Sequence, residues 1–504
     1  PSLPCTIIFM LATASLGALW SSCSPDFGSQ GVLDRFGQIK PKILIGVDGY
    51  YYNGKHIETT GKLREIAESL KSLKKVVVVP YTTPRPKIKS IKQSIHLKDF
   101  VKPFQPGRIK FKQVPFNHPL FIMFSSGTTG VPKCIVHGHG GTLLQHLKEH
   151  QLHTDIKPKD RFFYFTTCGW MMWNWLVSGL ASGATLLLYD GSPTYPKADT
   201  LFDFAQKEKI TIFGTSAKYI DAINKLGVQP KKTHKLTQLK TITSTGSPLS
   251  PESFDYVYTS IKKDVLLSSI AGGTDIISCF VLGDPTLPVH RGEIQRRGFG
   301  LSVQVFNDEG NIIVGEKGEL VCTKPFPSMP IGFWNDKGDR KYLSAYFSDY
   351  KNTWCHGDFI ELTKRGTLVI YGRSDAVLNP GGVRIGTAEI YRQVEKLDSV
   401  MESLVIGQSW QSDTRVVLFV RLRDGLTLNE SLQTEIKRTI RANTTPRHVP
   451  EKILQVPDIP RTKSGKIVEL AVRNIIHQET IKNIEALANP EALAYFKDRT
   501  ELKT

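Results

Sequence analysis

The most informative stretch of this chain is Phe124-Ser125-Ser126-Gly127-Thr128-Thr129-Gly130-Val131-Pro132-Lys133. It follows an apolar run, Leu120–Phe124, which predicts a buried strand. Glycine lets a backbone approach an anion closely, hydroxyls and amides donate to its oxygens, and the lysine adds a positive charge. The stretch therefore predicts a loop that binds polyphosphate. It is not a Walker A loop, because no Gly-Lys-Ser/Thr follows four residues after a glycine.

The composition predicts a globular protein with two or more domains. The chain has 504 residues, of which 40% are hydrophobic and 22% charged. Lys plus Arg (65) exceed Asp plus Glu (47), which gives a net charge of +18. The basic residues are dispersed, without zinc-finger spacing or an aromatic-basic RNA signature. We therefore favour polyphosphate ligands and a solvated basic surface over nucleic-acid binding.

The cysteines and histidines do not form a metal-binding pattern. Seven cysteines are scattered without a Cys-x-x-Cys pair, which predicts reduced thiols in a cytosolic protein. His146, His150 and His153 have helical spacing and could face one metal. No acidic helix residue accompanies them in a known metal-ligand spacing, so we interpret them as a polar helix face.

Residues 5–20 form an apolar segment that imitates a signal peptide. No basic residue precedes the segment, and the chain opens with Pro1. It is also short for a membrane span. We therefore expect a buried helix within a larger fold, no membrane insertion, and a true N-terminus that lies upstream.

Short apolar runs alternate with segments of helical spacing over most of the chain. Six runs predict strands buried on both faces: Lys42–Val47, Lys75–Val79, Leu120–Phe124, Thr185–Tyr189, Thr211–Phe213 and Thr241–Ser244. Gly61–Leu73 and Thr200–Lys209 predict helices between them. The sequence thus predicts an α/β fold in which residues 1–374 form a large domain of parallel-rich sheets covered by helices.

The pattern changes near residue 375. Thr387 is suited to cap a helix whose first turn contains Glu389. Strands are expected at Ser403–Ile406, Val416–Leu422 and Lys452–Val456, with a polar helix at Leu432–Arg441 between the last two. Residues 375–504 are therefore expected to form a small, mobile α+β domain.

Five further clusters carry residues suited to a nucleotide site. Thr245–Leu249 offers a Gly-Pro turn to a purine ring, and Ala271–Asp275 places a hydroxyl and a carboxylate after two glycines. Trp354–Asp358 ends in a carboxylate that could accept from ribose hydroxyls, and Gly372–Asp375 adds a cation beside it. Pro460–Lys466 ends in a lysine that could neutralise approaching anions. Each cluster alone could be an ordinary turn.

Together and in this order, the clusters resemble the signature elements of the adenylate-forming superfamily, within which the chain is similar to the acetyl-CoA synthetase-like acyl-CoA synthetases. The supporting stretches are Leu19–Gly28, Gly169–Trp175, Ala271–Asp275, Leu378–Arg384 and Asn489–Leu493. The resemblance covers essentially the whole chain. It begins partway into the family's large domain, so we expect that domain to be truncated at its start.

The resemblance implies roles for individual residues. The catalytic residues would be Lys466, Thr274 and Asp275, with Asp275 also the metal ligand and Asp375 the hinge. ATP would be bound by Ser125, Ser126, Gly127, Thr128, Thr129, Gly130, Lys133, Gly246, Ser247, Pro248, Asp358, Arg373 and Arg384. The acyl substrate would contact Trp170, Met171, Met172 and Gly272, although core packing is the alternative for these four.

Two departures from the family pattern matter for the predicted chemistry. Asp275 stands where Glu is usual, which shortens the reach to a metal by one methylene. By the same resemblance, Gly272 occupies the position at which acetyl-CoA synthetases carry a tryptophan that closes the acyl pocket. Replacing an indole by a hydrogen should leave room for an acid longer than acetate.

The resemblance implies an ATP-dependent acid-thiol ligase. It would activate acetoacetate through an acyl-adenylate, using Mg²⁺ and coenzyme A and releasing AMP and diphosphate. One alternative is a synthetase for butyrate, propionate or another short acid. Another is an inactive fragment or binding protein that keeps the fold without turnover. A basic binder of nucleic acid or membrane surfaces is a more distant alternative.

Overall fold

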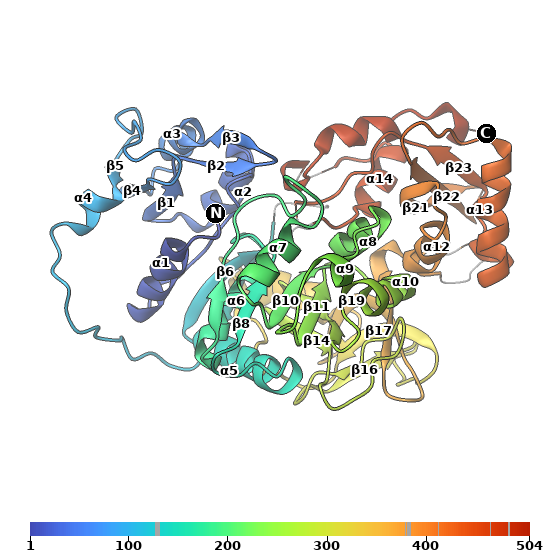
Figure 1. Ribbon diagram of the computed structural model, residues 1–504, viewed down its shortest axis with the longest axis horizontal. Coiled ribbons are helices and arrows are strands. Elements are labelled where there is room, and N and C mark those ends of the chain that lie inside the picture. The colour runs from blue at the N-terminus through green and yellow to red at the C-terminus, as the bar shows by residue number, and fades with distance from the viewer. Residues whose placement is uncertain are drawn as a thin grey trace.

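The computed structural model describes residues 1–125, 132–378, 380, 385–411, 413–463, 465–481 and 484–503. The N-terminal segment, in blue, lies on one side of a central body, and the C-terminal domain, in red, lies on the other (Figure 1). Within the described ranges, no helix combines the length and the apolar character that a membrane crossing requires.

A five-stranded parallel sheet forms the centre of the large domain. Its order is β12-β11-β10-β8-β9, with bounds Leu266–Ser269, Thr241–Thr245, Ile212–Ser216, Arg161–Tyr164 and Thr185–Leu187. The flanking helices are α6 (Met171–Ser178), α7 (Thr200–Lys207), α8 (Ala217–Lys225), α9 (Pro230–Thr233) and α10 (Pro251–Tyr256). Apolar runs form these strands because both faces of the sheet are covered. The predictions of strands near Thr185, Thr211 and Thr241 are confirmed.

A smaller parallel sheet, β1-β4-β5, lies in the N-terminal segment. Its strands are Ile43–Val47, Lys75–Val79 and Ser94–His96, and its helices are α2 (Ser29–Ile39), α3 (Thr60–Ser69) and α4 (Leu97–Val101). A hairpin of β2 (Gly49–Tyr52) and β3 (Lys55–Glu58) projects beside it. The strands predicted at Lys42–Val47 and Lys75–Val79 are confirmed.

The strand predicted at Leu120–Phe124 exists, but its sheet is antiparallel. β6 (Pro119–Phe124) pairs with β7 (Cys134–Gly138), which pairs with β18 (Gly332–Phe333). Two other antiparallel sheets follow: β13 (Ala271–Gly273), β14 (Ser278–Leu282) and β15 (Arg296–Arg297), then β16 (Val303–Phe306), β17 (Lys317–Cys322), β19 (Trp354–Leu362) and β20 (Leu368–Arg373). Helix α11 (Arg340–Tyr346) lies between β18 and β19 in the sequence. Apolar runs cannot distinguish strand direction when both faces are buried.

The helix face that carries three histidines is buried inside the molecule. His146, His150 and His153 occupy α5 (His139–Lys148) and the following π-helical turn (Glu149–His153), and all three are fully buried. The ring nitrogens of His146 contact the Ser178 hydroxyl at 2.8 Å and the Ile277 carbonyl at 2.6 Å, and His153 Nδ1 is 2.8 Å from the Gly283 carbonyl. Internal polar partners, not solvent, satisfy most of this helix face.

The predicted buried helix over residues 5–20 is partly wrong. Helix α1 spans Pro4–Ser15 and buries Ile7 and Met10. Ile8 and Leu11 are exposed, at 64% and 46% of full exposure, and Phe9 is half-buried. The helix therefore packs on the molecule by one face only.

The C-terminal domain is a three-stranded sheet with helices on its faces. β21 (Val400–Trp410), β22 (Asp413–Leu422) and β23 (Lys452–Gln455) form the sheet, and α12 (Thr387–Val394), α13 (Glu430–Asn443) and α14 (Glu469–Ile476) accompany it. Every strand and helix predicted there is confirmed, but the cap is Gly386, not Thr387. Glu389 accepts from the Gly386 amide at 2.9 Å, which places Thr387 in the first turn.

Candidate active site

A cavity of about 700 Å³ lies where the large domain meets the C-terminal domain. Most of the sequence-predicted residues line it: Trp170, Met171, Met172, Gly246, Ser247, Pro248, Gly272, Thr274, Asp358, Arg373 and Lys466. Their elements are far apart in the sequence, but the turn after β11, strand β13 and strands β19 and β20 all contribute residues to the cavity wall. Predicted site residues Ser126, Gly127, Thr128, Thr129, Gly130 and Arg384 lie outside the described residues.

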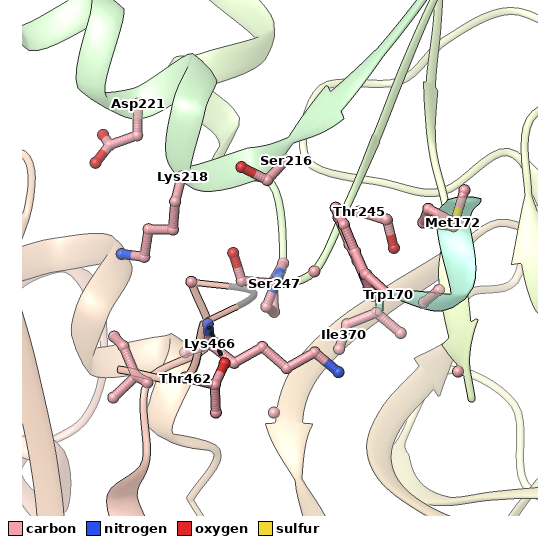
Figure 2. Close-up of a pocket in the computed structure, with 18 of the residues that line it drawn as sticks. Trp170, Met172, Ser216, Lys218, Asp221, Thr245, Ser247, Ile370, Thr462 and Lys466 are labelled. Atoms are coloured by element: carbon pink, nitrogen blue, oxygen red, sulfur yellow. Dashed lines mark hydrogen bonds between the residues drawn. The ribbon is translucent and has the colours of Figure 1, made fainter. Parts of the chain in front are cut away.

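The predicted adenine turn follows β11. Gly246 has φ +93°, a left-handed conformation that L side chains rarely adopt, so glycine is required there. An ideal Cβ at Gly246 would lie 3.7 Å from Trp170 Cζ2, which shows that the indole stands beside the turn. Figure 2 shows Ser247 and Trp170 on facing sides of the opening. A flat aromatic wall and a backbone turn together suit a purine ring.

Asp358 and Arg373 form the predicted ribose group. They are directly opposite each other on β19 and β20. Arg373 Nη1 donates to Asp358 Oδ1 at 3.0 Å and to the His356 carbonyl at 3.1 Å. Gly357 has φ +78°, a left-handed conformation that L side chains rarely adopt, so glycine is favoured there. The pair presents a carboxylate and a cation side by side at the cavity wall.

Asp275 lies against the lysine of the phosphate loop. Lys133 Nζ is 3.4 Å from Asp275 Oδ1, and the Tyr346 hydroxyl donates to the same oxygen. Although burial alone would raise the pKa of Asp275, the charge of Lys133 and the bond from Tyr346 lower it to about 2. Asp275 therefore carries a fixed negative charge. The preceding carbonyl, of Thr274, is 2.9 Å from His137 Nε2.

The residues present fit a magnesium ion that is held partly by its nucleotide. Among the described residues, no group of three His, Cys, Asp or Glu side chains could hold a metal alone. Mg²⁺ is usually bound through one or two carboxylates plus substrate phosphates. The ionised Asp275 supplies one such carboxylate next to the predicted phosphate loop.

Lys466 reaches the cavity from the C-terminal domain. Its amide donates to Thr462 Oγ1 at 3.0 Å in a turn that contains Gly465 at φ +81°. Figure 2 shows the side chain extending across the opening toward Ile370. The Lys466 side chain is exposed because it projects into the open cavity, and protein atoms surround that cavity. Burial and the like charge of Arg373 lower the pKa of Lys466 below its ordinary value.

The steric role predicted for Gly272 is wrong in this structure. An ideal Cβ at Gly272 would lie 2.2 Å from the Ser278 carbonyl oxygen and 2.6 Å from Cys279 Cα. The space next to the α-carbon is thus filled by the backbone of β14 and does not open into the cavity. Gly272 lines the cavity by its backbone, and the glycine permits the close approach of β13 and β14.

Trp170, Met171 and Met172 lie at the start of α6, where the cavity meets the core. Met171 and Met172 are 4% and 1% exposed and pack with Trp173 and Trp175 in one apolar cluster. Both methionines also line the cavity. These residues therefore belong to the core and also line the cavity, and their contact with the acyl substrate stays a prediction.

Four predicted residues that the structure describes do not line the cavity. Lys133 and Asp275 contact each other beside it, and Ser125 is buried, with its amide 3.3 Å from the Lys133 carbonyl. Asp375 lies in a short 3₁₀ turn after β20, and its carboxylate is 3.6 Å from Arg373 Nε. Its side chain is 52% exposed.

Sequence reasoning missed the residues that support these groups from a distance. Tyr346 and His137 contact the Thr274–Asp275 turn, and Lys218 joins the domains by an ion pair with Glu395 at 3.4 Å. None of them belongs to a local motif. Their partners are 71, 137 and 177 residues away in the sequence, so no spacing signal could have found them.

The fold and the site together define an enzyme that adenylates a substrate. Residues 1–331 match the AMP-binding enzyme model, and residues 392–466 match the model of the AMP-binding enzyme C-terminal domain. The chain belongs to the AMP-binding enzyme family.

Two similar relatives are acetoacetyl-CoA synthetases. The chain is 62% identical to an acetoacetyl-coenzyme A synthetase of Rhizobium meliloti, covering 100% of this chain and 77% of the relative. It is 49% identical to the acetoacetyl-CoA synthetase of Rattus norvegicus, covering 98% and 75%.

Solved structures agree with this assignment. The acetoacetyl-CoA synthetase from Streptomyces lividans superposes with a TM-score of 0.93 at 42% identity, covering 100% of this chain and 77% of that one. An anthranilate CoA ligase in complex with anthranoyl-AMP superposes with a TM-score of 0.79 at 20% identity, covering 92% and 84%, and shares the fold.

Proposed function

We propose that this chain is an acetoacetate–CoA ligase that forms AMP and diphosphate. The observation that carries the proposal is the position of Lys466, whose ammonium shares one cavity with the adenine turn, Asp358 and Trp170. The agreement in name among relatives of 62% and 49% identity supports acetoacetate as the acid. The seven cysteines are free thiols, which agrees with a cytosolic location.

The first reaction joins the acid to AMP. A carboxylate oxygen of acetoacetate attacks the α-phosphorus of ATP, and the bond from that phosphorus to the bridging oxygen breaks as diphosphate leaves. Two anions must approach each other, so Lys466 and Arg373 stabilise the transition state by positive charge. Mg²⁺, when bound with ATP, would be held by Asp275 and would neutralise phosphate charge. Asp358 would hold the ribose.

The second reaction transfers the acyl group to the coenzyme A thiol. The sulfur attacks the acyl carbon of the adenylate, the bond to the phosphate oxygen breaks, and AMP leaves. Adenylation supplies the poor electrophile with a good leaving group. We propose that the C-terminal domain, residues 375–504, rotates about Asp375 between the two reactions, which would withdraw Lys466 from the cavity.

Diphosphate release tests the proposal directly. Purified protein with ATP and Mg²⁺ should release diphosphate with acetoacetate faster than with butyrate or acetate, and should need coenzyme A for sustained turnover. Lys466→Ala should slow adenylation about 10²–10³-fold, as when one charge-stabilising group is lost. Lys497→Ala, which removes an exposed lysine of the same domain, is the matched control. A preference for acetate, or full activity of Lys466→Ala, would contradict the proposal.

The hinge has its own test. A proline at position 375 fixes φ and removes an amide donor, so Asp375→Pro should hold the C-terminal domain in one orientation. Adenylation measured by diphosphate release should persist, whereas thioester formation from the adenylate should fall at least tenfold. Equal loss of both reactions would mean that residue 375 is structural and not a pivot.

A further inference from the structure

Tyr346 fixes one oxygen of the Asp275 carboxylate and leaves the other available. Its hydroxyl donates to Oδ1, and Lys133 Nζ lies 3.4 Å from the same oxygen. Oδ2 accepts no hydrogen bond from any residue that the structure describes. A carboxylate held in this way cannot rotate freely, because rotation would break the charge-assisted bond to Oδ1.

The Tyr346 ring is itself held rigidly. It stacks on Trp354 with ring centroids 3.8 Å apart and planes at 14°, and Phe333 meets it edge-on at 5.8 Å. Trp354 begins β19, the strand that also carries Asp358. Lys133 Nζ lies 4.9 Å from the centre of the Tyr346 ring, within reach of a cation–π interaction. The hydroxyl therefore has a fixed position relative to two carboxylates of the site.

Asp275 is one methylene shorter than the glutamate usual at its position, so its carboxylate lies closer to its own backbone and depends more on its orientation. We propose that Tyr346 is a positioning residue whose hydroxyl holds Asp275 Oδ1 so that Oδ2 is presented to the divalent cation that accompanies ATP. The inference rests on the proposed function, because it assumes a nucleotide in the cavity. Residues that hydrogen-bond a ligating carboxylate commonly change metal affinity about 10–100-fold when they are removed.

Tyr346→Phe removes the hydroxyl and keeps the ring. The stack on Trp354 and the face toward Lys133 remain, so the variant should fold with a melting temperature near that of the parent. Tyr342→Phe is the matched control, because Tyr342 packs against Tyr346 in the same aromatic cluster at 5.5 Å. Among the described residues, the hydrogen-bond donors to Asp275 are Tyr346 and Lys133, not Tyr342.

Calorimetry of ATP binding to the full chain, with and without Mg²⁺, measures the effect without turnover. In the parent, Mg²⁺ should tighten ATP binding. The increase in ATP affinity that Mg²⁺ causes should be about tenfold smaller in Tyr346→Phe than in the parent. The affinity of this variant for ATP without Mg²⁺ should stay within twofold of the parent. Tyr342→Phe should behave as the parent.

A double-mutant cycle shows whether Tyr346 acts through Asp275. Asp275→Asn should remove the Mg²⁺-dependent tightening, and adding Tyr346→Phe to it should change nothing more. The inference would be overturned if Mg²⁺ tightened ATP binding by Tyr346→Phe to within twofold of the parent. It would also be overturned if Tyr346→Phe caused the same loss in the Asp275→Asn background as in the parent. A parent protein whose ATP binding ignores Mg²⁺ would contradict the proposed function instead.

Discussion

Replacing Gly272 by alanine should destabilise the protein rather than retune its choice of acid. The added Cβ would lie 2.2 Å from the Ser278 carbonyl oxygen, 2.6 Å from Cys279 Cα and 2.9 Å from the Ser278 carbonyl carbon. All three atoms belong to the backbone of β14, so no side-chain rotation can make room. Ordinary contact would require β13 and β14 to separate by about 1 Å in a densely packed region.

The strand behind Gly272 is anchored, which sets the size of the effect. Glu149 accepts from the Ser278 hydroxyl and from the Cys279 amide at 3.1 Å, and it is fully buried. Moving β14 would therefore strain a buried carboxylate as well as two strands. Overpacking usually costs about 1–3 kcal/mol. We expect Gly272→Ala to lie near the upper end, at about 2–3 kcal/mol of unfolding free energy.

Urea denaturation of two neighbouring glycine variants checks this prediction. Gly273→Ala is the matched control, because the nearest atoms to its added Cβ are 4.0 Å away. Gly272→Ala should unfold at a clearly lower urea midpoint, whereas Gly273→Ala should unfold within about 0.5 kcal/mol of the parent. The reasoning is refuted if Gly272→Ala keeps the parent's midpoint and shifts diphosphate release from acetoacetate to acetate, since the methyl group would then point into the pocket.

Three further predictions concern charge. The pKa of Glu149 is lowered because the charge of Lys148 and the hydrogen bonds to the carboxylate outweigh the effect of burial. The stabilisation that the ionised Glu149 contributes is therefore present above the ordinary glutamate pKa and is lost on acidification. Glu149→Gln should lower the free energy of unfolding by about 2–3 kcal/mol at pH 7 and should flatten the acid side of the plot of melting temperature against pH. Because the pKa of Lys466 is lowered, adenylation should decline with rising pH before the ordinary lysine range, and an unchanged profile in Lys466→Arg would contradict this. Lys218→Met removes the ion pair between the domains that Lys218 forms with Glu395. Single-turnover adenylation should therefore slow about fivefold, whereas thioester formation from supplied adenylate should be unchanged. Equal loss of both reactions would indicate a folding defect instead.

The parts of the fold and site that the sequence predicted are those encoded by local strings. The run at Lys75–Val79 forms a strand because burial on both faces selects apolar residues. The turns at Gly246 and Gly465 use glycine because their φ values are positive. Such features depend on neighbouring residues only, and a single sequence contains them.

The parts that it did not predict depend on distant contacts. The direction in which a side chain at position 272 would point follows from the register of β13 against β14, and no spacing in the sequence predicts that register. His146 of α5 is buried, with its ring nitrogens against the Ser178 hydroxyl and the Ile277 carbonyl, which lie far from it in the sequence. Tyr346 is 71 residues from Asp275 in the sequence, and only the packing of α11 on β19 brings them together.

The contacts between the two domains explain how one cavity can serve two reactions. Lys218 pairs with Glu395 at 3.4 Å, Lys396 with Glu252 at 3.5 Å, and Lys225 donates to the Met401 carbonyl at 2.6 Å. The apolar clusters of the C-terminal domain are closed within that domain. Polar contacts of this kind can exchange with water, so the domain can undock without exposing its core.

In the proposed function, the interface between the two domains must be weak enough to separate between the two reactions. In the proposed function, Lys466 would enter the cavity only while the C-terminal domain is docked, and its charge would serve the approach of two anions, not the later attack of the thiol on the adenylate. An interface made apolar at Lys218 and Glu395 would hold the docked orientation longer, because separating it would expose apolar surface to water. Thioester formation would then slow, although no residue that touches the acid had changed.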